Sequence, residues 1–456
     1  MSYMEEIYQK AVRNHPKEAE YHRAVAEVFT SVRPVVDLHE KRFREAALLE
    51  RLTEPERSIS FRVPWVDDSG QVRVNRGWRI QFSSALGPYK GGLRFNLSVN
   101  QGNLKQAAFE QTLKNALTGF HVGGAKGGSD FDRRGKSDCE VMAFCQSFMR
   151  ELYRHTGKTG DILTADFGAG IAEIGYLFGE YRKLTGAHNG AITGKGLSFG
   201  GIRVRPQAAG YGLVYILEAM LRQSGMGLEG KTAVVSGSGK MAIHAAEKLM
   251  QLGAKVVALS DENGFLYDEN GIRLDVMRRI KMVVRESFTG SIRGYTAEVP
   301  GSVYIESSAF FCTEKNRIWS IPCDIALPCA GRGEMCAGDV KLLAANGCIA
   351  VAEGAINPLT DGATDCMKKS GILYMPGKAA NIGGVVVSNL EMCQNKGKRN
   401  WSLDVADTEL RRTMGIVFRD CAEAAERYGM PGDYLAGANI TAFEKVAEAM
   451  LSQGCV

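Results

Sequence analysis

The sequence lacks the features that mark several large classes of protein. It has no Cys-x-x-Cys pair, and its eleven cysteines are scattered, which argues against a zinc site or disulfide framework and favours reduced thiols. No apolar run approaches membrane-spanning length, and the first residues lack a charged-then-apolar signal pattern. The net charge of +5 is small and is not gathered into a basic tract, so nucleic-acid binding has no support. We therefore predict a soluble, cytoplasmic protein with no metal, membrane or nucleic-acid partner.

The length and composition that remain are those of a globular enzyme. A chain of 456 residues with 45% apolar and 23% charged residues is too long for one ordinary core, which predicts two domains. Residues 1–56 have apolar positions at helical spacing and no catalytic constellation, so we expect a packing or subunit-contact layer. Residues 59–66 and 72–82 alternate around a turn at 67–70, which predicts a strand, a turn and a returning strand.

Lys126 stands between two Gly-Gly pairs, within residues 118–130. Glycine permits strained turns and lets backbone approach a ligand closely. An ammonium among apolar and backbone groups is partly desolvated, which suits it to proton transfer or to polarising a carbonyl. A Walker phosphate loop is excluded because Gly127, not Ser or Thr, follows the lysine. A catalytic lysine and a structural turn remain as alternatives.

Two further lysines come from the segments just before this one. Lys90 follows Gly87 and precedes a Gly-Gly pair, and a helix predicted from about residue 102 to 117 carries Gln111 and Lys114 three residues apart on one face. Three converging lysines would suit a small dianionic substrate. The alternative is that Lys90 and Lys114 are solvated surface charges.

Asp166 ends an apolar strand at residues 161–165 and enters a glycine turn. The carboxyl ends of parallel strands are where sites form, and an Asp beside a lysine can move protons. Asp is also a favoured N-cap, so a capping role for the helix that follows is the alternative.

Residues 231–261 have the pattern of a dinucleotide-binding unit. A short apolar strand leads into Gly237-x-Gly239-x-x-Ala242, an amphipathic helix follows, and a second strand ends at Asp261. This context predicts a tight turn that presents a helix N-terminus to a pyrophosphate, and an acidic residue for a ribose. Later strands near residues 325–329, 349–352 and 372–375 continue a doubly wound α/β pattern.

Taken together, these segments resemble the hexameric, NADP-linked glutamate dehydrogenases along nearly the whole chain. The matching stretches are residues 88–95, 109–118, 123–132, 377–381 and 437–440. The resemblance implies an α/β fold of two domains with the active site in the cleft. It places an N-terminal α/β substrate and oligomerisation domain at residues 1–202 plus 432–456, and a Rossmann-type, doubly wound dinucleotide-binding domain at 203–431.

The resemblance also implies site residues. Lys126 would activate water and polarise the substrate carbonyl, and Asp166 would move protons to and from ammonia and the imino intermediate. Lys114 with Gln111 would hold the α-carboxylate, and Lys90 with Ser388 the distal carboxylate. The other substrate contacts implied are Ala165, Arg205 and Val385. The cofactor contacts implied are Ala209, Gly237, Ser238, Gly239, Lys240, Met241, Ser260, Asp261, Lys281 and Asn381.

The sequence departs from the family pattern at a cluster of positions, most of which would contact the nicotinamide half of the cofactor. The residues found there are Ala165, Ala172, Ala209, Lys240, Gly333, Ile356 and the pair His121-Val122. Each lost hydrogen bond weakens binding by about 0.5–1.5 kcal/mol, so several together could weaken it by orders of magnitude. Lys240 could compensate in part by meeting the pyrophosphate as a point charge.

We predict an NADP-dependent glutamate dehydrogenase that forms a homohexamer and takes a small dicarboxylate and ammonia. For the cofactor, Asp261 would suit the ribose of NAD and Glu262 would oppose a phosphate, whereas Lys281 and Arg285 could supply the counter-charge for NADP. We favour NADP and keep NAD as the alternative. Two other functions stay open: a diverged paralogue acting on another acidic amino or keto acid, and a catalytically weak structural or regulatory subunit.

Overall fold

The computed structural model describes residues 1–284, 287–306 and 318–456 and divides into two compact units. Unit 1 comprises Met1–Arg203, Ser388–Ser402 and Ala438–Val456, and unit 2 comprises Val204–Val387 and Leu403–Gly437. The expected domains, 1–202 plus 432–456 and 203–431, differ from this division most at Ser388–Ser402. That segment lies in unit 1 because its buried polar side chains bond to strands of the unit 1 sheet.

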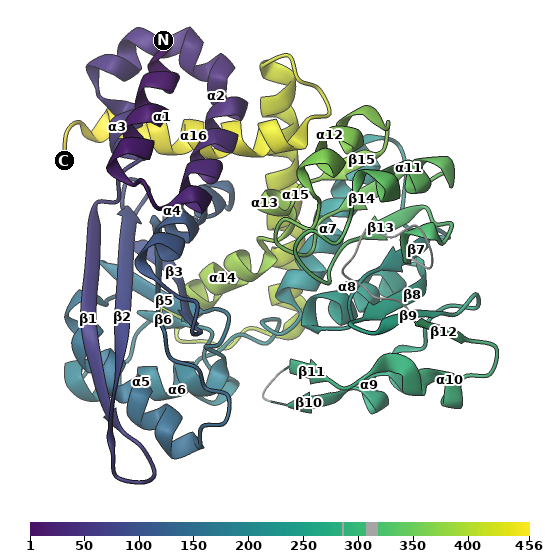
Figure 1. The fold of residues 1–456 in the computed structure, drawn as a ribbon, viewed down its shortest axis with the longest axis horizontal. Coiled ribbons are helices and arrows are strands. Elements are labelled where there is room, and N and C mark those ends of the chain that lie inside the picture. The colour runs from purple at the N-terminus through teal and green to yellow at the C-terminus, as the bar shows by residue number, and fades with distance from the viewer. Residues whose placement is uncertain (285–286, 307–317) are drawn as a thin grey trace. The chain divides into compact units, whose positions relative to one another are not determined.

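Unit 1 is built on a six-stranded sheet with the order β1-β2-β4-β3-β5-β6 (Figure 1). Its strands are β1 (Arg57–Val66), β2 (Val72–Ser83), β3 (Tyr89–Phe95), β4 (Gly124–Ser129), β5 (Asp161–Ala165) and β6 (Ile192–Thr193). β1, β2 and β4 pair antiparallel, which confirms the predicted hairpin, and β4, β3, β5 and β6 run parallel. The parallel part therefore gathers the carboxyl ends of several strands at one edge.

The helices of unit 1 pack on this sheet and on one another. They are α1 (Tyr3–Asn14), α2 (Ala19–Glu45), α3 (Leu48–Leu52), α4 (Gln101–Leu117), α5 (Asp138–Leu152) and α6 (Ile171–Thr185), with 3-10 turns η1 (Tyr153–His155) and η2 (Leu197–Phe199). Most of α16 (Tyr434–Gln453), from Ala438 on, and the later part of α14 (Gly383–Gly397), from Ser388 on, also belong here. α4, predicted from about residue 102 to 117, is confirmed and packs against β2 and β4.

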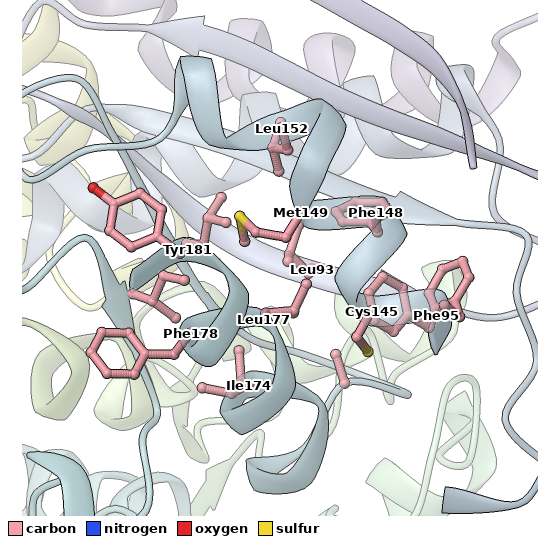
Figure 2. Packing of buried hydrophobic residues seen from close by; sticks show 14 of the residues in the cluster. Leu93, Phe95, Cys145, Phe148, Met149, Leu152, Ile174, Leu177, Phe178 and Tyr181 are labelled. Atoms are coloured by element: carbon pink, nitrogen blue, oxygen red, sulfur yellow. The ribbon is translucent and has the colours of Figure 1, made fainter. Parts of the chain in front are cut away.

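The hydrophobic core of unit 1 shows why α5 forms where it does. Ser137 and Glu140 make a reciprocal capping box at its start, and apolar residues then recur at helical spacing. Phe148 lies in one buried cluster with Leu93 of β3 and Leu177 of α6 (Figure 2). Phe144 belongs to the same cluster and its ring lies 6.0 Å from that of Phe148. This core fixes β3 and β5, the two strands that lead to the predicted site.

Unit 2 is a seven-stranded sheet with the order β12-β9-β8-β7-β13-β14-β15. Its strands are β7 (Thr232–Val235), β8 (Lys255–Asp261), β9 (Gly264–Tyr267), β12 (Val303–Glu306), β13 (Ile325–Leu327), β14 (Ala350–Ala352) and β15 (Leu373–Met375). Five neighbouring strands are parallel, in the order β8-β7-β13-β14-β15, whereas β9 and β12 are antiparallel additions at one edge. A separate hairpin pairs β10 (Met282–Val284) with β11 (Ser287–Thr289).

Helices connect these strands in the doubly wound manner (Figure 1). They are α7 (Ala208–Gln223), α8 (Lys240–Gln251), α9 (Leu274–Ile280), α10 (Tyr295–Glu298), α11 (Ala337–Ala345), α12 (Asp361–Lys369), α13 (Gly377–Ala380) and α15 (Leu403–Arg427), with 3-10 turns η3 (Ile292–Gly294) and η4 (Ile318–Ser320). The chain leaves β7 for β8 on one side and later returns to β13 on the other. This reversal is a topological switch point, where open α/β sheets bind ligands beyond the strand carboxyl ends. Among the described residues, no helix is long and apolar enough to cross a membrane.

Candidate active site

Lys126 and Asp166 form an ion pair in unit 1, from neighbouring parts of its sheet. Lys126 lies in β4, and its Nζ is 2.6 Å from Oδ2 of Asp166, which directly follows Ala165 at the end of β5. Arg94 of β3 brings its Nη2 to 3.4 Å from the same oxygen. Burial alone would raise the pKa of Asp166, but the charges of Lys126 and then Arg94 outweigh it and hold that pKa well below its usual range. The structure therefore gathers a carboxylate between two cations.

The glycines around Lys126 serve a purpose that the sequence did not indicate. The segment is a buried central strand and not a strained turn, and its glycines do not have positive φ. A Cβ at Gly124 would overlap the side chain of Thr112, and one at Gly128 would overlap the carbonyl of Arg94. Glycine is required because the neighbouring strand and helix approach so closely. The turn interpretation is therefore wrong, and the close packing holds Lys126 in place.

Lys90 is a second buried cation in unit 1, at the second position of β3. It is only 2% exposed, and its Nζ donates to Ser388 Oγ and to Asn389 Oδ1, each at 2.7 Å. Ser388 Oγ lies 2.6 Å from Thr193 Oγ1 and 3.4 Å from Thr164 Oγ1. Lys90 and Ser388, predicted as a pair, are thus brought together, and the lysine is not a solvated surface charge.

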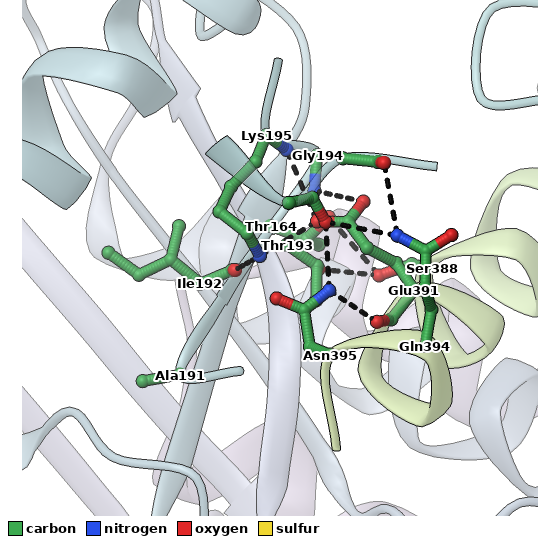
Figure 3. Close-up of polar contacts among 12 residues, drawn as sticks. Thr164, Ala191, Ile192, Thr193, Gly194, Lys195, Ser388, Glu391, Gln394 and Asn395 are labelled. Atoms are coloured by element: carbon green, nitrogen blue, oxygen red, sulfur yellow. Dashed lines mark hydrogen bonds and ion pairs between the residues drawn. The ribbon is translucent and has the colours of Figure 1, made fainter. Parts of the chain in front are cut away.

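A buried ion pair fixes the part of α14 that carries Ser388. The carboxylate of Glu391 accepts from Lys195 Nζ at 2.9 Å and from the Gly194 backbone N–H at 2.9 Å, and both charged side chains are fully buried (Figure 3). Lys195 Nζ also donates to the Ile192 carbonyl at 2.6 Å. These bonds join α14 to β6, so they set the position of Ser388 one helical turn before Glu391.

Gln111 and Lys114 both lie on α4, as predicted, and Gln111 is linked to the Lys90 strand. Gln111 Nε2 donates to Asn115 Oδ1 at 2.8 Å, and Asn115 Nδ2 donates to the Lys90 carbonyl at 3.0 Å. Lys114 is half-buried three residues after Gln111. The structure thus places an amide and an ammonium on the helix that packs against β4.

In unit 2, the predicted phosphate-binding loop follows β7 at the switch point. Gly237 has φ +81°, a conformation that favours glycine, and its N–H donates to Ser260 Oγ at 2.6 Å, at the end of β8. Gly239 precedes α8 and makes no side-chain cap, while Lys240 and Met241 form the first turn of that helix. A Cβ at Gly239 would meet open space. The loop therefore leads into a helix N-terminus, where the first backbone N–H groups have no partner within the helix.

Lys281 reaches this loop from the end of α9. It is 5% exposed, and its Nζ donates to Ser238 Oγ at 3.0 Å and to the Gly290 carbonyl at 2.7 Å. Burial lowers the pKa of Lys281, which the charges of Asp261 and Glu262 partly oppose. The predicted partner Arg285 lies outside the described residues.

Asp261 ends β8, and its oxygens already accept four hydrogen bonds from the chain. Oδ1 accepts from Tyr304 Oη at 2.7 Å and from the Asn263 N–H at 3.0 Å. Oδ2 accepts from Ser291 Oγ and from the Ile292 N–H, each at 3.0 Å. A carboxylate has about four acceptor sites. A ribose hydroxyl would therefore have to displace one of these donors.

Beyond β13 and β14, buried polar groups shape the next loops. Ser236 Oγ accepts from the Ala330 N–H at 3.2 Å, and Glu334 Oε1 accepts from the same N–H at 2.9 Å. Burial raises the pKa of Glu334 to about 7. Asn381 Nδ2 donates to the Gly354 carbonyl at 2.8 Å. These bonds hold the loops next to the phosphate-binding loop.

The remaining predicted contacts also lie in unit 2. Arg205 Nη1 donates to the Gly384 carbonyl at 2.5 Å, Val385 is the next residue along α14, and Ala209 is the second residue of α7. Within the ranges 1–284, 287–306 and 318–456, no group of three or more His, Cys, Asp or Glu side chains is placed to hold a metal ion.

Comparison with known proteins decides the family. Residues 200–454 match the Glutamate/Leucine/Phenylalanine/Valine dehydrogenase family, and residues 55–183 match the Glu/Leu/Phe/Val dehydrogenase dimerisation domain. The chain belongs to this family. It is 48% identical to the NADP-specific glutamate dehydrogenase of Helicobacter pylori, over 99% of this chain and 100% of that protein. It is 47% identical to the NADP-specific glutamate dehydrogenase of Escherichia coli and to the NAD(P)-specific enzyme of Xylanibacter ruminicola, over 99% and 98% of this chain and 99% of each relative.

Solved structures agree with the two-domain dehydrogenase fold. The crystal structure of Plasmodium falciparum glutamate dehydrogenase is 43% identical, with a TM-score of 0.93 over 99% of this chain and 95% of that chain. The hetero-hexameric glutamate dehydrogenase of Thermus thermophilus is 26% identical, with a TM-score of 0.77 over 92% of this chain and 97% of that chain.

Two departures from the glutamate dehydrogenase pattern can be placed in this family member. Gly333 has φ +67°, a left-handed conformation that glycine adopts without strain. Ile356 is 54% exposed, an unusual position for a large apolar side chain.

Sequence reasoning missed the buried polar residues that support the site in this dehydrogenase. Thr193, Lys195, Glu391 and Glu334 all lie close to predicted residues, yet their spacing carries no motif. Glu391 and Lys195 are 196 positions apart, so nothing local pairs them. Thr193 and Lys195 could have been found from the sequence, because they stand in a glycine-dense stretch, as Lys126 does.

Proposed function

We propose that this chain catalyses the reversible NADP-linked oxidative deamination of L-glutamate. The reaction converts glutamate, NADP⁺ and water into 2-oxoglutarate, ammonium, NADPH and a proton. The observation that carries the proposal is the 2.6 Å contact between Lys126 Nζ and Asp166 Oδ2, in a unit that also buries Lys90 against Ser388. The full-length identity to NADP-specific glutamate dehydrogenases supports it.

Lys90 and Ser388 would hold the distal carboxylate of the substrate. Lys90 is 2% exposed and donates to oxygens of Ser388 and Asn389, so it places a buried cation beside Ser388 that a carboxylate would pair with. Gln111 and Lys114, on the helix that packs against β4, would hold the α-carboxylate. The side chains thus provide one cation for each end of a dicarboxylate.

Lys126 and Asp166 would move the protons. Lys126 would polarise the substrate carbonyl and activate the water that attacks the imino intermediate. Asp166 would take a proton from the amino group or water and pass it on. Lys126 and Arg94 hold its pKa well below the usual range, so it would release that proton readily. Lys126 Nζ and Asp166 Oδ2 are 2.6 Å apart, so both groups would act on the same reacting centre.

The unit 2 loop after β7 fits NADP. The backbone N–H groups at the start of α8 would bind the pyrophosphate, and Lys281, bonded to Ser238, would hold the extra phosphate. Asp261, already accepting four bonds, favours this assignment over NAD. When bound, the cofactor supplies the hydride acceptor for oxidation and the donor for the reverse reaction.

A hexameric assembly and a cytoplasmic location complete the proposal. The hetero-hexameric Thermus thermophilus relative supports six subunits and keeps a mixed hexamer as an alternative to a homohexamer. The cytoplasmic location is supported by the eleven scattered cysteines, whose spacing is typical of reduced thiols. Light scattering of the purified chain tests the assembly, because a homohexamer requires six times the mass of 49.6 kDa.

The test of the proposed chemistry is the Lys126→Ala variant, assayed for NADPH oxidation with 2-oxoglutarate and ammonium. We expect a loss of about 10²–10⁴ in kcat, because no other group can supply the positioned amine. The matched control is Lys158→Ala, since Lys158 is an exposed lysine in the turn before β5. Circular dichroism and NADPH affinity should be unchanged in both. Activity of Lys126→Ala within a few-fold of the parent would contradict the role.

A further inference from the structure

Asn389 carries a buried amide nitrogen that has no hydrogen-bond partner among the described residues. The residue is 1% exposed, and its Nδ2 is one of the few buried side-chain nitrogens left without a partner there. A buried donor without a hydrogen bond lowers the stability of the folded protein, so each such group in a native protein needs an explanation. The amide lies next to Ser388 on α14, beside the proposed distal-carboxylate site.

The orientation of this amide is fixed by chemistry. A lysine ammonium can only donate hydrogen bonds, so the amide atom 2.7 Å from Lys90 Nζ must be the oxygen of Asn389. The other amide atom, Nδ2, is therefore the one that does not face the ammonium, although it is bonded to the same carbon as Oδ1. The negative end of the amide dipole faces the cation, so the positive end, at Nδ2, is left to meet an acceptor.

We infer that Asn389 determines specificity by donating from Nδ2 to the distal carboxylate of the substrate. A carboxylate bound by Lys90 and Ser388 would lie beside Asn389, the next residue along α14, and its second oxygen would be the acceptor that Nδ2 lacks. Asn389 then both orients Lys90 through Oδ1 and reads the anion through Nδ2. This inference deepens the proposed function and rests on it.

The geometry around Asn389 keeps the amide from turning to another role. Ser388 is tied to Thr193, and Glu391 is tied to Lys195, so the helical turn on either side of Asn389 is fixed to β6 (Figure 3). Reversing the amide would place its nitrogen donors against the Lys90 ammonium, which is repulsive. The donor is therefore preorganised, and preorganised donors bind an anion without a reorganisation cost.

The test compares two substrates that differ only at the distal carbon. The substrate 2-oxoglutarate ends in a carboxylate and 2-oxopentanoate ends in a methyl group on the same chain. For Asn389→Ala, we expect kcat/KM for 2-oxoglutarate to fall about 10- to 100-fold, mainly through KM, as for loss of a hydrogen bond to a charged group. Turnover of 2-oxopentanoate should stay within about threefold, because that substrate offers the amide no acceptor.

Two further variants separate this role from a structural one. Asn389→Asp keeps the shape but puts a carboxylate beside Lys90, so it should lower kcat/KM for 2-oxoglutarate further than Asn389→Ala. Asn395→Ala is the matched control on the same helix, because Asn395 Nδ2 is already satisfied by the Gly200 and Glu391 carbonyls at 2.8 and 2.6 Å. It should leave the ratio of the two substrates unchanged.

The outcomes distinguish this inference from the proposed function. A parent enzyme that prefers 2-oxopentanoate would overturn the proposed function and the role of Asn389 together. A parent that prefers 2-oxoglutarate, with Asn389→Ala equally active or equally impaired on both substrates, would overturn the role of Asn389 alone. In that case the amide is met by water or serves only packing.

Discussion

Replacing Lys281 with methionine should reduce the use of NADPH while sparing NADH. Lys281 Nζ lies 3.0 Å from Ser238 Oγ in the phosphate-binding loop, and the side chain is 5% exposed, so its charge acts in a poorly solvated place. A hydrogen bond to a charged group contributes about 1.5–3 kcal/mol. Loss of the bond to the phosphate should therefore lower kcat/KM for NADPH by about 10- to 150-fold.

The assay measures kcat/KM for both cofactors with 2-oxoglutarate and ammonium held saturating. NADH is the internal control for folding, since Lys281→Met also removes the bond to the Gly290 carbonyl at 2.7 Å. The matched variant is Lys255→Met, because Lys255 is exposed and donates to another backbone carbonyl, that of Glu269, at 3.1 Å. Its cofactor preference should equal that of the parent.

The same lysine predicts a pH dependence. Because burial lowers the pKa of Lys281, its charge is present below that pKa and is lost as the pH rises through it. The parent should therefore lose its preference for NADPH on going from neutral to alkaline pH, and Lys281→Met should show little change. Equal effects of Lys281→Met on both cofactors, or none on either, would refute the assignment.

Two predictions concern stability. The pKa of Asp166 is lower in the folded than in the unfolded protein, so its pairing stabilises the fold above the unfolded pKa, and this stabilisation is lost as the pH falls toward the folded pKa. The difference in unfolding free energy between the parent and Asp166→Asn, measured by urea unfolding, should therefore shrink from neutral to acidic pH. A difference that grows would contradict the ion pair. In Gly91→Ala a Cβ would overlap the Ala125 carbonyl, so strands β3 and β4 must separate and the protein should unfold at a much lower temperature, whereas Gly157→Ala, with open space around it, should keep the parent melting temperature.

The sequence predicted the elements whose signals are local. Alternation gave the β1–β2 hairpin, and the pattern around Gly237 gave the strand, loop and helix that follow one another in unit 2. The glycines around Lys126 left a catalytic lysine and a structural turn as alternatives, and the structure shows a strand whose glycines are required by neighbouring backbone and side chains that only the fold brings together.

Supporting charges could not be predicted because their partners are distant in sequence. Arg79 and Asp161 are both fully buried and 82 positions apart, with Arg79 Nε 2.9 Å from Asp161 Oδ2. Arg79 also donates to the Gly91 carbonyl at 3.1 Å, next to Lys90. A charged residue in a strand of alternating pattern is normally expected on the solvent-exposed face. Only the folded sheet shows that this one positions the strand that carries Lys90.

The most direct test of the central claim is the initial rate of NADP⁺ reduction by the purified chain with L-glutamate. Norvaline, which has the same carbon chain without the distal carboxylate, and NAD⁺ serve as the comparison substrate and cofactor. We predict that NADPH forms together with equal amounts of 2-oxoglutarate and ammonium, with the highest kcat/KM for glutamate and NADP⁺. No NADPH from glutamate, or a higher kcat/KM for norvaline, would contradict the account.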